Sequence, residues 1–98
     1  MSHVFELVSY TAKNAENALK LRREAMDHAK ELKGFVRYHA LVNTEDNKHF
    51  ADLVEWASLE DAHAAAEKVM TLPAFQGMMA EIESVESMKH FNIDKIAE

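Results

Sequence analysis

Residues 49–61 read HFADLVEWASLED, and this stretch joins a strand to the start of a helix. His49 to Trp56 is short and rich in apolar and aromatic residues, which predicts a β-strand. Ser58 stands three residues before Asp61, so the segment after the strand has the shape of a capping box, the signature that opens a helix. A strand followed directly by a capped helix predicts a domain of mixed α and β structure.

The residues before this stretch supply two more strands and one helix. Phe35–Val42 predicts a strand, and the polar turn 43–48 joins it to His49–Trp56 as an antiparallel hairpin. Val4–Tyr10 predicts another strand. A helix is expected from Asn14, a suitable N-cap, to Lys33, with Gly34 in the left-handed conformation that ends many helices.

The residues after this stretch complete the domain. Pro73 is disfavoured inside a helix but suits a first turn, so we expect a break near Leu72 and a second helical piece, Ala74–Ile82. Val85–Ile93 is the predicted last strand, and 94–98 is a loose tail. The inward face of the helix after Ser58 is predicted to consist of Ala62, Ala65, Ala66 and Val69.

The predicted element order is β-α-β-β-α-β, in a single domain spanning 1–98. Two right-handed crossovers of this type predict an α+β, ferredoxin-like fold, with a four-stranded antiparallel sheet and both helices on one face. The expected spatial order of the strands is fourth, first, third, second. A chain of 98 residues leaves little room for a second domain.

The predicted strands are apolar on both faces. A sheet covered on one face only should alternate apolar and polar residues, so the second face needs a cover. A second copy of the chain, related by a two-fold axis, is the predicted cover, and the alternative is an exposed apolar face. The paired apolar residues are Val4-Phe5, Leu7-Val8, Phe35-Val36, Ala40-Leu41-Val42 and Leu53-Val54.

Charge and composition exclude several classes of function. The net charge is −6 and the basic residues are scattered, which argues against nucleic acid or an anionic membrane surface as a partner. The chain has no cysteine, no signal-peptide pattern and no apolar run long enough to span a membrane, so we expect a cytoplasmic protein. Phosphate loops, dinucleotide fingerprints and nucleophile elbows are missing from the sequence.

Three polar residues lie inside apolar strands: Glu6, Asp52 and His90. In the expected strand order the first strand is central, so Glu6 could lie between the other two. A buried carboxylate must be paired or protonated, and an imidazole is a natural partner for it. These residues are our candidate catalytic group, and the alternative is a satisfied polar network that fixes dimer register.

Trp56 ends its strand and is expected at the mouth of the layer between sheet and helices. With Phe75, Met78, Met79 and Tyr10 it could line a pocket for a hydrophobic ligand, or these residues could simply be core. His39 is a further candidate if it faces the same side. No histidine and carboxylate spacing certifies a metal site, so none is predicted.

Three segments together resemble the dimeric α/β-barrel superfamily, and most closely its antibiotic-biosynthesis-monooxygenase-like group. They are FADLVEWAS at 50–58, LPAF at 72–75 after an alanine-rich helix, and SMKHF at 87–91. The resemblance spans nearly the whole chain, but its motifs are mostly structural. It implies two ferredoxin-like sheets paired as a barrel, with a pocket between each sheet and its helices.

The resemblance also implies a range of activities. Some members oxidise polycyclic phenols without metal or flavin, some degrade haem, and many have no known activity. Haem-degrading members have an Asn on the first strand and a His on the second helix. This chain has Glu6 in that strand and no His in the segment after Phe75, a departure from the haem pattern.

The sequence is therefore compatible with two functions. The first is a cofactor-independent monooxygenase for an aromatic or enolisable substrate, in which His90, assisted by Glu6 or Asp52, abstracts a proton. No cofactor is expected. The second is a non-catalytic homodimeric module that binds a small hydrophobic ligand.

Overall fold

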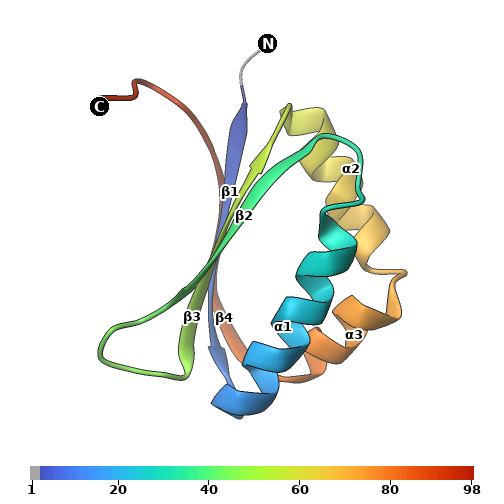
Figure 1. The fold of residues 1–98 in the computed structure, drawn as a ribbon, viewed down its shortest axis with the longest axis vertical. Coiled ribbons are helices and arrows are strands. Elements are labelled where there is room, and N and C mark those ends of the chain that lie inside the picture. Colours follow the sequence, from blue (N-terminus) through green and yellow to red (C-terminus); the bar gives the residue numbers. More distant parts are fainter. Residues whose placement is uncertain (1–2) are drawn as a thin grey trace.

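The four strands form one antiparallel sheet in the order β2-β3-β1-β4, which is the predicted order read from the opposite edge. The computed structural model describes residues 3–98. All three helices lie on one side of the sheet, and its other side is uncovered (Figure 1). The strands are β1 (Val4–Ala12), β2 (Phe35–Val42), β3 (His49–Trp56) and β4 (Ile82–Asn92). The expected ferredoxin-like fold is confirmed.

Local sequence signals set where the helices begin. The helices are α1 (Ala15–Ala29), α2 (Leu59–Val69) and α3 (Pro73–Ala80). Asn14 caps α1, because its Oδ1 accepts a hydrogen bond from the backbone N–H of Asn17 at 3.0 Å. Ser58 caps α2 in the same way, through the N–H of Asp61 at 3.0 Å. Pro73 is the first residue of α3, the position where its missing N–H costs nothing.

The helix ends differ from the prediction. Helix α1 stops at Ala29 rather than Lys33, because the backbone tightens into turns in which Glu31 bonds to His28 and Leu32 to Ala29. These turns bring Leu32 against the buried cluster around Trp56. Helix α3 ends at Ala80, two residues before the predicted end at Ile82.

Strands β1 and β4 are longer than predicted toward the α3 end of the sheet. Strand β1 continues to Ala12, and β4 starts at Ile82 rather than Val85. The extra pairs, Thr11 with Ser84 and Ala12 with Ile82, follow irregularities in the register. Polar residues in this stretch obscure the apolar pattern by which a strand is predicted. In the folded chain, pairing between β1 and β4 nevertheless makes these residues part of the strands.

The helix-facing side of the sheet carries the core. Tyr10 and Phe50 are the largest fully buried side chains, and their rings pack edge to face at 5.8 Å. Trp56 packs in the same way on Phe35, at 5.9 Å. Against them the helices present small residues, since the buried apolar positions of α1 and α2 are Ala18, Ala25, Ala29, Ala62 and Ala65.

The uncovered side of the sheet is largely apolar at its centre. Residues paired directly across strands point to the same face, and neighbours along a strand alternate. The pairs Leu7–Leu53 on β1 and β3 and Phe5–Phe91 on β1 and β4 therefore share this face. Leu41 on β2 lies on it too, opposite Ala51. The predicted two-sided apolarity thus holds at this centre, whereas Glu55 beside Phe5, Lys89 beside Leu7 and His39 beside Leu53 place polar groups around it.

Candidate functional site

A cavity of about 340 Å³ lies between the helices and the helix-facing side of the sheet. Three of its wall residues are alanines, Ala29 on α1 and Ala65 and Ala66 on α2. Their methyl groups are too short to fill the space over the sheet, which leaves it open. A cavity of this size is within the range of small-molecule sites.

Apolar side chains make most of the cavity wall. Trp56, Phe75 and Met79, three of the predicted ligand-binding residues, line it. Met70 and Met88 add two flexible thioether side chains to the same wall. Three of the six predicted ligand-binding residues thus line this cavity.

Two carboxyl groups face this apolar space, and both belong to the predicted catalytic group. Glu6 and Asp52 line the cavity from β1 and β3. Glu6 pairs with Val54 and Val8 pairs with Asp52, so the two acids are diagonal neighbours on one sheet face. Acidic groups in an otherwise apolar cavity are the feature that chemistry or ligand recognition would use.

Glu6 is held by Trp56. The indole Nε1 of Trp56 donates a hydrogen bond of 3.0 Å to Oε1 of Glu6. Burial raises the pKa of Glu6 above its ordinary value, while the Trp56 hydrogen bond and the His90 imidazole oppose that rise and Asp52 adds slightly to it. Burial and one orienting hydrogen bond make this carboxyl group a candidate proton acceptor.

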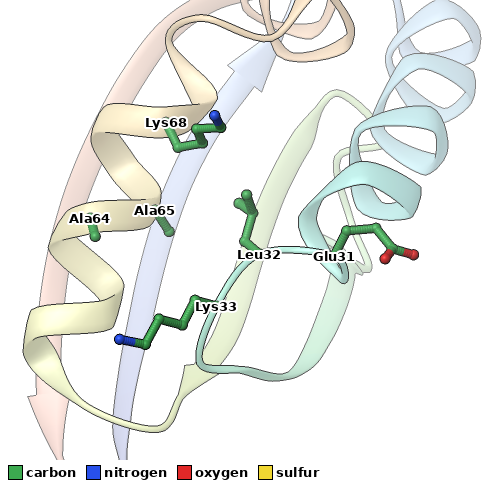
Figure 2. A pocket seen from close by; sticks show the side chains of 6 residues that line it. All are labelled: Glu31, Leu32, Lys33, Ala64, Ala65 and Lys68. Atoms are coloured by element: carbon green, nitrogen blue, oxygen red, sulfur yellow. The ribbon is translucent and has the colours of Figure 1, made fainter.

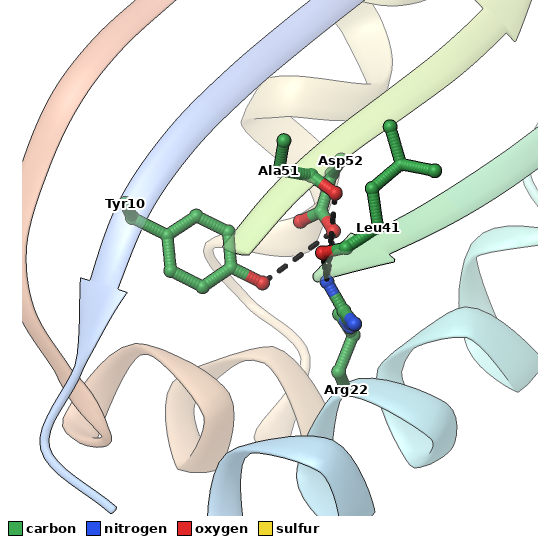
Figure 3. Close-up of polar contacts among 5 residues, drawn as sticks. All are labelled: Tyr10, Arg22, Leu41, Ala51 and Asp52. Atoms are coloured by element: carbon green, nitrogen blue, oxygen red, sulfur yellow. Dashed lines mark hydrogen bonds and ion pairs between the residues drawn. The ribbon is translucent and has the colours of Figure 1, made fainter. Parts of the chain in front are cut away.

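Asp52 sits in a denser network. Nη1 of Arg22 donates to its Oδ1 at 3.2 Å, and the Tyr10 hydroxyl donates to the same oxygen at 3.4 Å (Figure 3). Burial raises the pKa of Asp52, and the Tyr38 hydroxyl and the Arg22 guanidinium oppose that rise. Burial likewise raises the pKa of both Tyr10 and Tyr38, so the two phenols remain hydrogen-bond donors at neutral pH.

Arg22 is a residue that the sequence analysis missed. Only 3% of its surface is exposed. Its Nη1 also donates to the backbone oxygen of Leu41 at 3.1 Å, and its guanidinium lies 4.4 Å from the centre of the Phe50 ring. The signal was available in the spacing, since Arg22 lies on the buried stripe of α1, four residues after Ala18 and three before Ala25.

Tyr38 is a second residue that was missed. It lines the cavity from β2 and lies opposite Val54 of β3. Its place in the strand gave a signal, because Tyr38 and Ala40 share one parity and Ala40 pairs with Asp52. Together with Trp56, it gives the cavity two aromatic residues that carry hydrogen-bond donors.

His90 lies beside Glu6 but does not line the cavity. The two residues are directly paired across β1 and β4. The Nε2 of His90 is buried without a hydrogen-bond partner among residues 3–98. Its ring packs edge to face on His63 of α2, at 5.3 Å between centroids. Glu6, Asp52 and His90 thus lie on neighbouring strands, as predicted, but only Glu6 and Asp52 line the cavity.

Three other predicted ligand-binding residues lie outside the cavity wall. Tyr10 and Met78 belong to the buried core, and Tyr10 acts on the site only through Asp52. His39 pairs with Leu53, whereas Ala40 pairs with Asp52. His39 therefore points to the uncovered face, and the condition on which it was a candidate, that it faces the cavity side, is not met.

Residues 3–98 contain neither a metal-ligand cluster nor a membrane-spanning helix. No cluster of three or more His, Asp and Glu side chains is arranged to hold a metal ion there. Within the same part of the chain, no helix combines the length and the apolarity needed to cross a membrane.

Comparison with sequence families and curated proteins gives no match. Comparison with solved structures gives many, at low sequence identity. A variant of SnoaB, a cofactor-independent oxygenase from Streptomyces nogalater, has a TM-score of 0.85 and 14% identity, with 98% of this chain and 97% of that chain covered.

Two proteins assigned as antibiotic biosynthesis monooxygenases are also similar in structure. The one from Bordetella bronchiseptica has a TM-score of 0.83 and 9% identity over 99% of this chain and 100% of that chain. The one from Nitrosomonas europaea has a TM-score of 0.75 and 17% identity over 94% and 88%. The resemblance seen in the sequence is thus confirmed in the structure: this chain has the ferredoxin-like fold of the antibiotic-biosynthesis-monooxygenase structures.

Proposed function

We propose that the chain is a cofactor-independent monooxygenase for an aromatic substrate with an acidic C–H or phenolic O–H group. The observation that carries the proposal is the Glu6 carboxyl group, which lines an apolar cavity and is oriented by the Trp56 indole. The oxygenase activity of SnoaB, a protein with the same fold, supports the choice of reaction.

In the proposed reaction, Glu6 acts as the general base. It takes a proton from the substrate and leaves an electron-rich carbanion, whose charge the hydroxyl of the cavity-lining Tyr38 would stabilise. The carbanion reacts with O₂ to give a peroxide, which takes up the proton and loses water. For an anthrone the balance is one CH₂ group plus O₂ giving one C=O group plus H₂O.

This assignment changes the role first expected of His90. Glu6 lines the cavity and His90 does not, so Glu6 is the better-placed base. His90, its direct neighbour across β1 and β4, would act on Glu6 only through its proximity. Asp52, whose Oδ1 is held by Arg22 and Tyr10, would orient the substrate.

Oxygen consumption tests the proposal, with dithranol, a three-ring anthrone, as the probe. The wild-type chain should accelerate O₂ uptake over the uncatalysed background, and Glu6→Gln should reduce this rate by about 100-fold or more. Glu86→Gln is the matched control, because Glu86 is an exposed carboxylate on β4 and should leave the rate unchanged. Equal rates for the wild type, Glu6→Gln, Asp52→Asn and His90→Ala would contradict the proposal.

The alternative is a module that binds a hydrophobic ligand without transforming it. The specific observation in its favour is that Asp52 and Glu6 already have hydrogen-bond donors within the chain, as in a structural network. It predicts that dithranol binds in the cavity and leaves as dithranol.

We further propose that the chain forms a homodimer through the uncovered sheet face, as the sequence predicted. The support is the apolar centre of that face, formed by Phe5, Leu7, Leu53 and Phe91. Exposure of such a patch to water is costly, and a second copy removes it from water.

A further inference from the structure

A second hollow, of about 350 Å³, adjoins the cavity at the surface. It lies between the turn after α1 and the helix α2, and Leu32 and Ala65 line both spaces. In Figure 2 the Leu32 side chain points into the hollow, between the turn and α2. The cavity and the hollow thus share a boundary made by one leucine and one alanine.

Two lysines border this hollow. Lys33 reaches from the turn toward α2, and Lys68 reaches from α2 toward Leu32, whereas the carboxylate of Glu31 points away (Figure 2). Neither lysine is ion-paired with a carboxylate among residues 3–98, although nearby Lys30 pairs with Asp27. On a chain of net charge −6, this hollow therefore carries two lysines without an ion pair and one acidic residue, Glu31, whose carboxylate points away.

The interior of the cavity has the opposite charge character. Glu6 and Asp52 line it, and an anionic group placed beside these carboxyl groups would be disfavoured. An apolar ring, by contrast, fits between Trp56 and Phe75. An elongated ligand with a ring and an anionic end thus has one favourable orientation.

We propose that the ligand of this cavity is an aromatic acid, with its ring beside Trp56 and its anionic end between Lys33 and Lys68. The inference rests on the proposed function in one respect, that the cavity is the binding site. It adds the charge class of the ligand and two specificity-determining residues. Leu32 is the side chain that must move or yield when the acid chain passes from the cavity to the surface.

A matched pair of probes tests the inference without any turnover. Naphthylbutanoate and its methyl ester have the same ring and chain, and only the first carries a charge. By titration calorimetry the anion should bind the wild type roughly fivefold to tenfold more tightly than the ester, the range expected for two partly exposed ion pairs. Added salt should reduce this preference.

Variants locate the charge preference. The double variant Lys33→Gln/Lys68→Gln should lose the preference for the anion while its affinity for the ester stays unchanged. Lys30→Gln removes the same charge from a neighbouring lysine that does not border the hollow, and it should keep the preference. All three lysines are exposed, so these variants should fold normally, which a thermal melt checks.

The outcomes separate this inference from the proposed function. Equal binding of acid and ester by the wild type overturns the inference and leaves the cavity as a binding site. A preference for the anion that survives in the double variant also overturns the inference, since residues other than these two lysines then bind the anionic group. Binding of neither probe contradicts both the inference and the use of the cavity as a binding site.

Discussion

The indole Nε1 of Trp56 donates a hydrogen bond of 3.0 Å to Oε1 of Glu6, and this bond joins β3 to β1 across the floor of the cavity. Trp56 pairs with Val4, two residues from Glu6, so the contact is a diagonal one on the helix-facing side. It places a carboxyl group against apolar surface and orients it. The folded chain therefore keeps an acid where a neutral group would be more stable.

Replacing Glu6 with Gln should stabilise the chain at neutral pH. Burial raises the pKa of Glu6 in the folded state, so its contribution to stability is present below pH 4.5 and is lost as the pH rises through the folded pKa. Glu6→Gln should gain roughly 1 kcal/mol at about pH 8 and close to nothing at about pH 4. Urea denaturation at both pH values measures the difference. A gain of equal size at the two pH values would show that ionisation of Glu6 is not its source.

Removing Arg22 should show how strongly a buried, unpaired Asp52 lowers the free energy of unfolding. Arg22→Met leaves the carboxylate without its cation and should destabilise the chain by about 3–5 kcal/mol. The double variant Arg22→Met/Asp52→Asn should recover a large part of that loss, because the uncompensated charge is gone. Denaturant unfolding of the wild type, both single variants and the double variant gives the coupling energy. Strictly additive losses would mean that the 3.2 Å contact carries no net interaction.

Two glycines should respond oppositely to alanine. Gly34 has a φ of +82°, and a methyl group there would overlap the Asp61 side chain, so Gly34→Ala should cost about 2 kcal/mol or more. Gly77 lies inside α3, where a methyl group would meet only Leu21 at 3.7 Å. Gly77→Ala should therefore stabilise the chain by about 0.5–1 kcal/mol. Thermal melts of both variants test the pair, and a loss at Gly77 equal to that at Gly34 would contradict this account.

A charge on the uncovered sheet face should break the proposed dimer. Leu53 lies at the centre of that face, so Leu53→Glu should yield a monomer by light scattering at concentrations where the wild type has twice the chain mass. Leu59→Glu is the matched control, since Leu59 is 45% exposed at the start of α2, on the helix side. A monomeric wild type would contradict the proposed dimer. A monomer from the Leu59 variant alone would contradict its formation through the uncovered sheet face.

Local signals explain which parts of the fold were predictable. The bounds of β2 and β3 were predicted to the residue, because a turn rich in Asn and Asp separates two apolar runs. The caps at Asn14 and Ser58 and the position of Pro73 were equally local. The end of α1 was not, because Leu32 leaves the helix to contact a cluster from distant strands.

The sequence by itself determined the order of the elements, the two-sided apolarity of the strands, and the presence of Glu6, Asp52 and Trp56 within apolar strands. Each depends on residues adjacent in the chain. Only the tertiary structure decided which of these side chains share a space. Strand parity turned His39 away from the cavity, and the packing of α1 brought a buried Arg22 to Asp52. Such contacts join residues far apart in the sequence, and no local pattern encodes their distance.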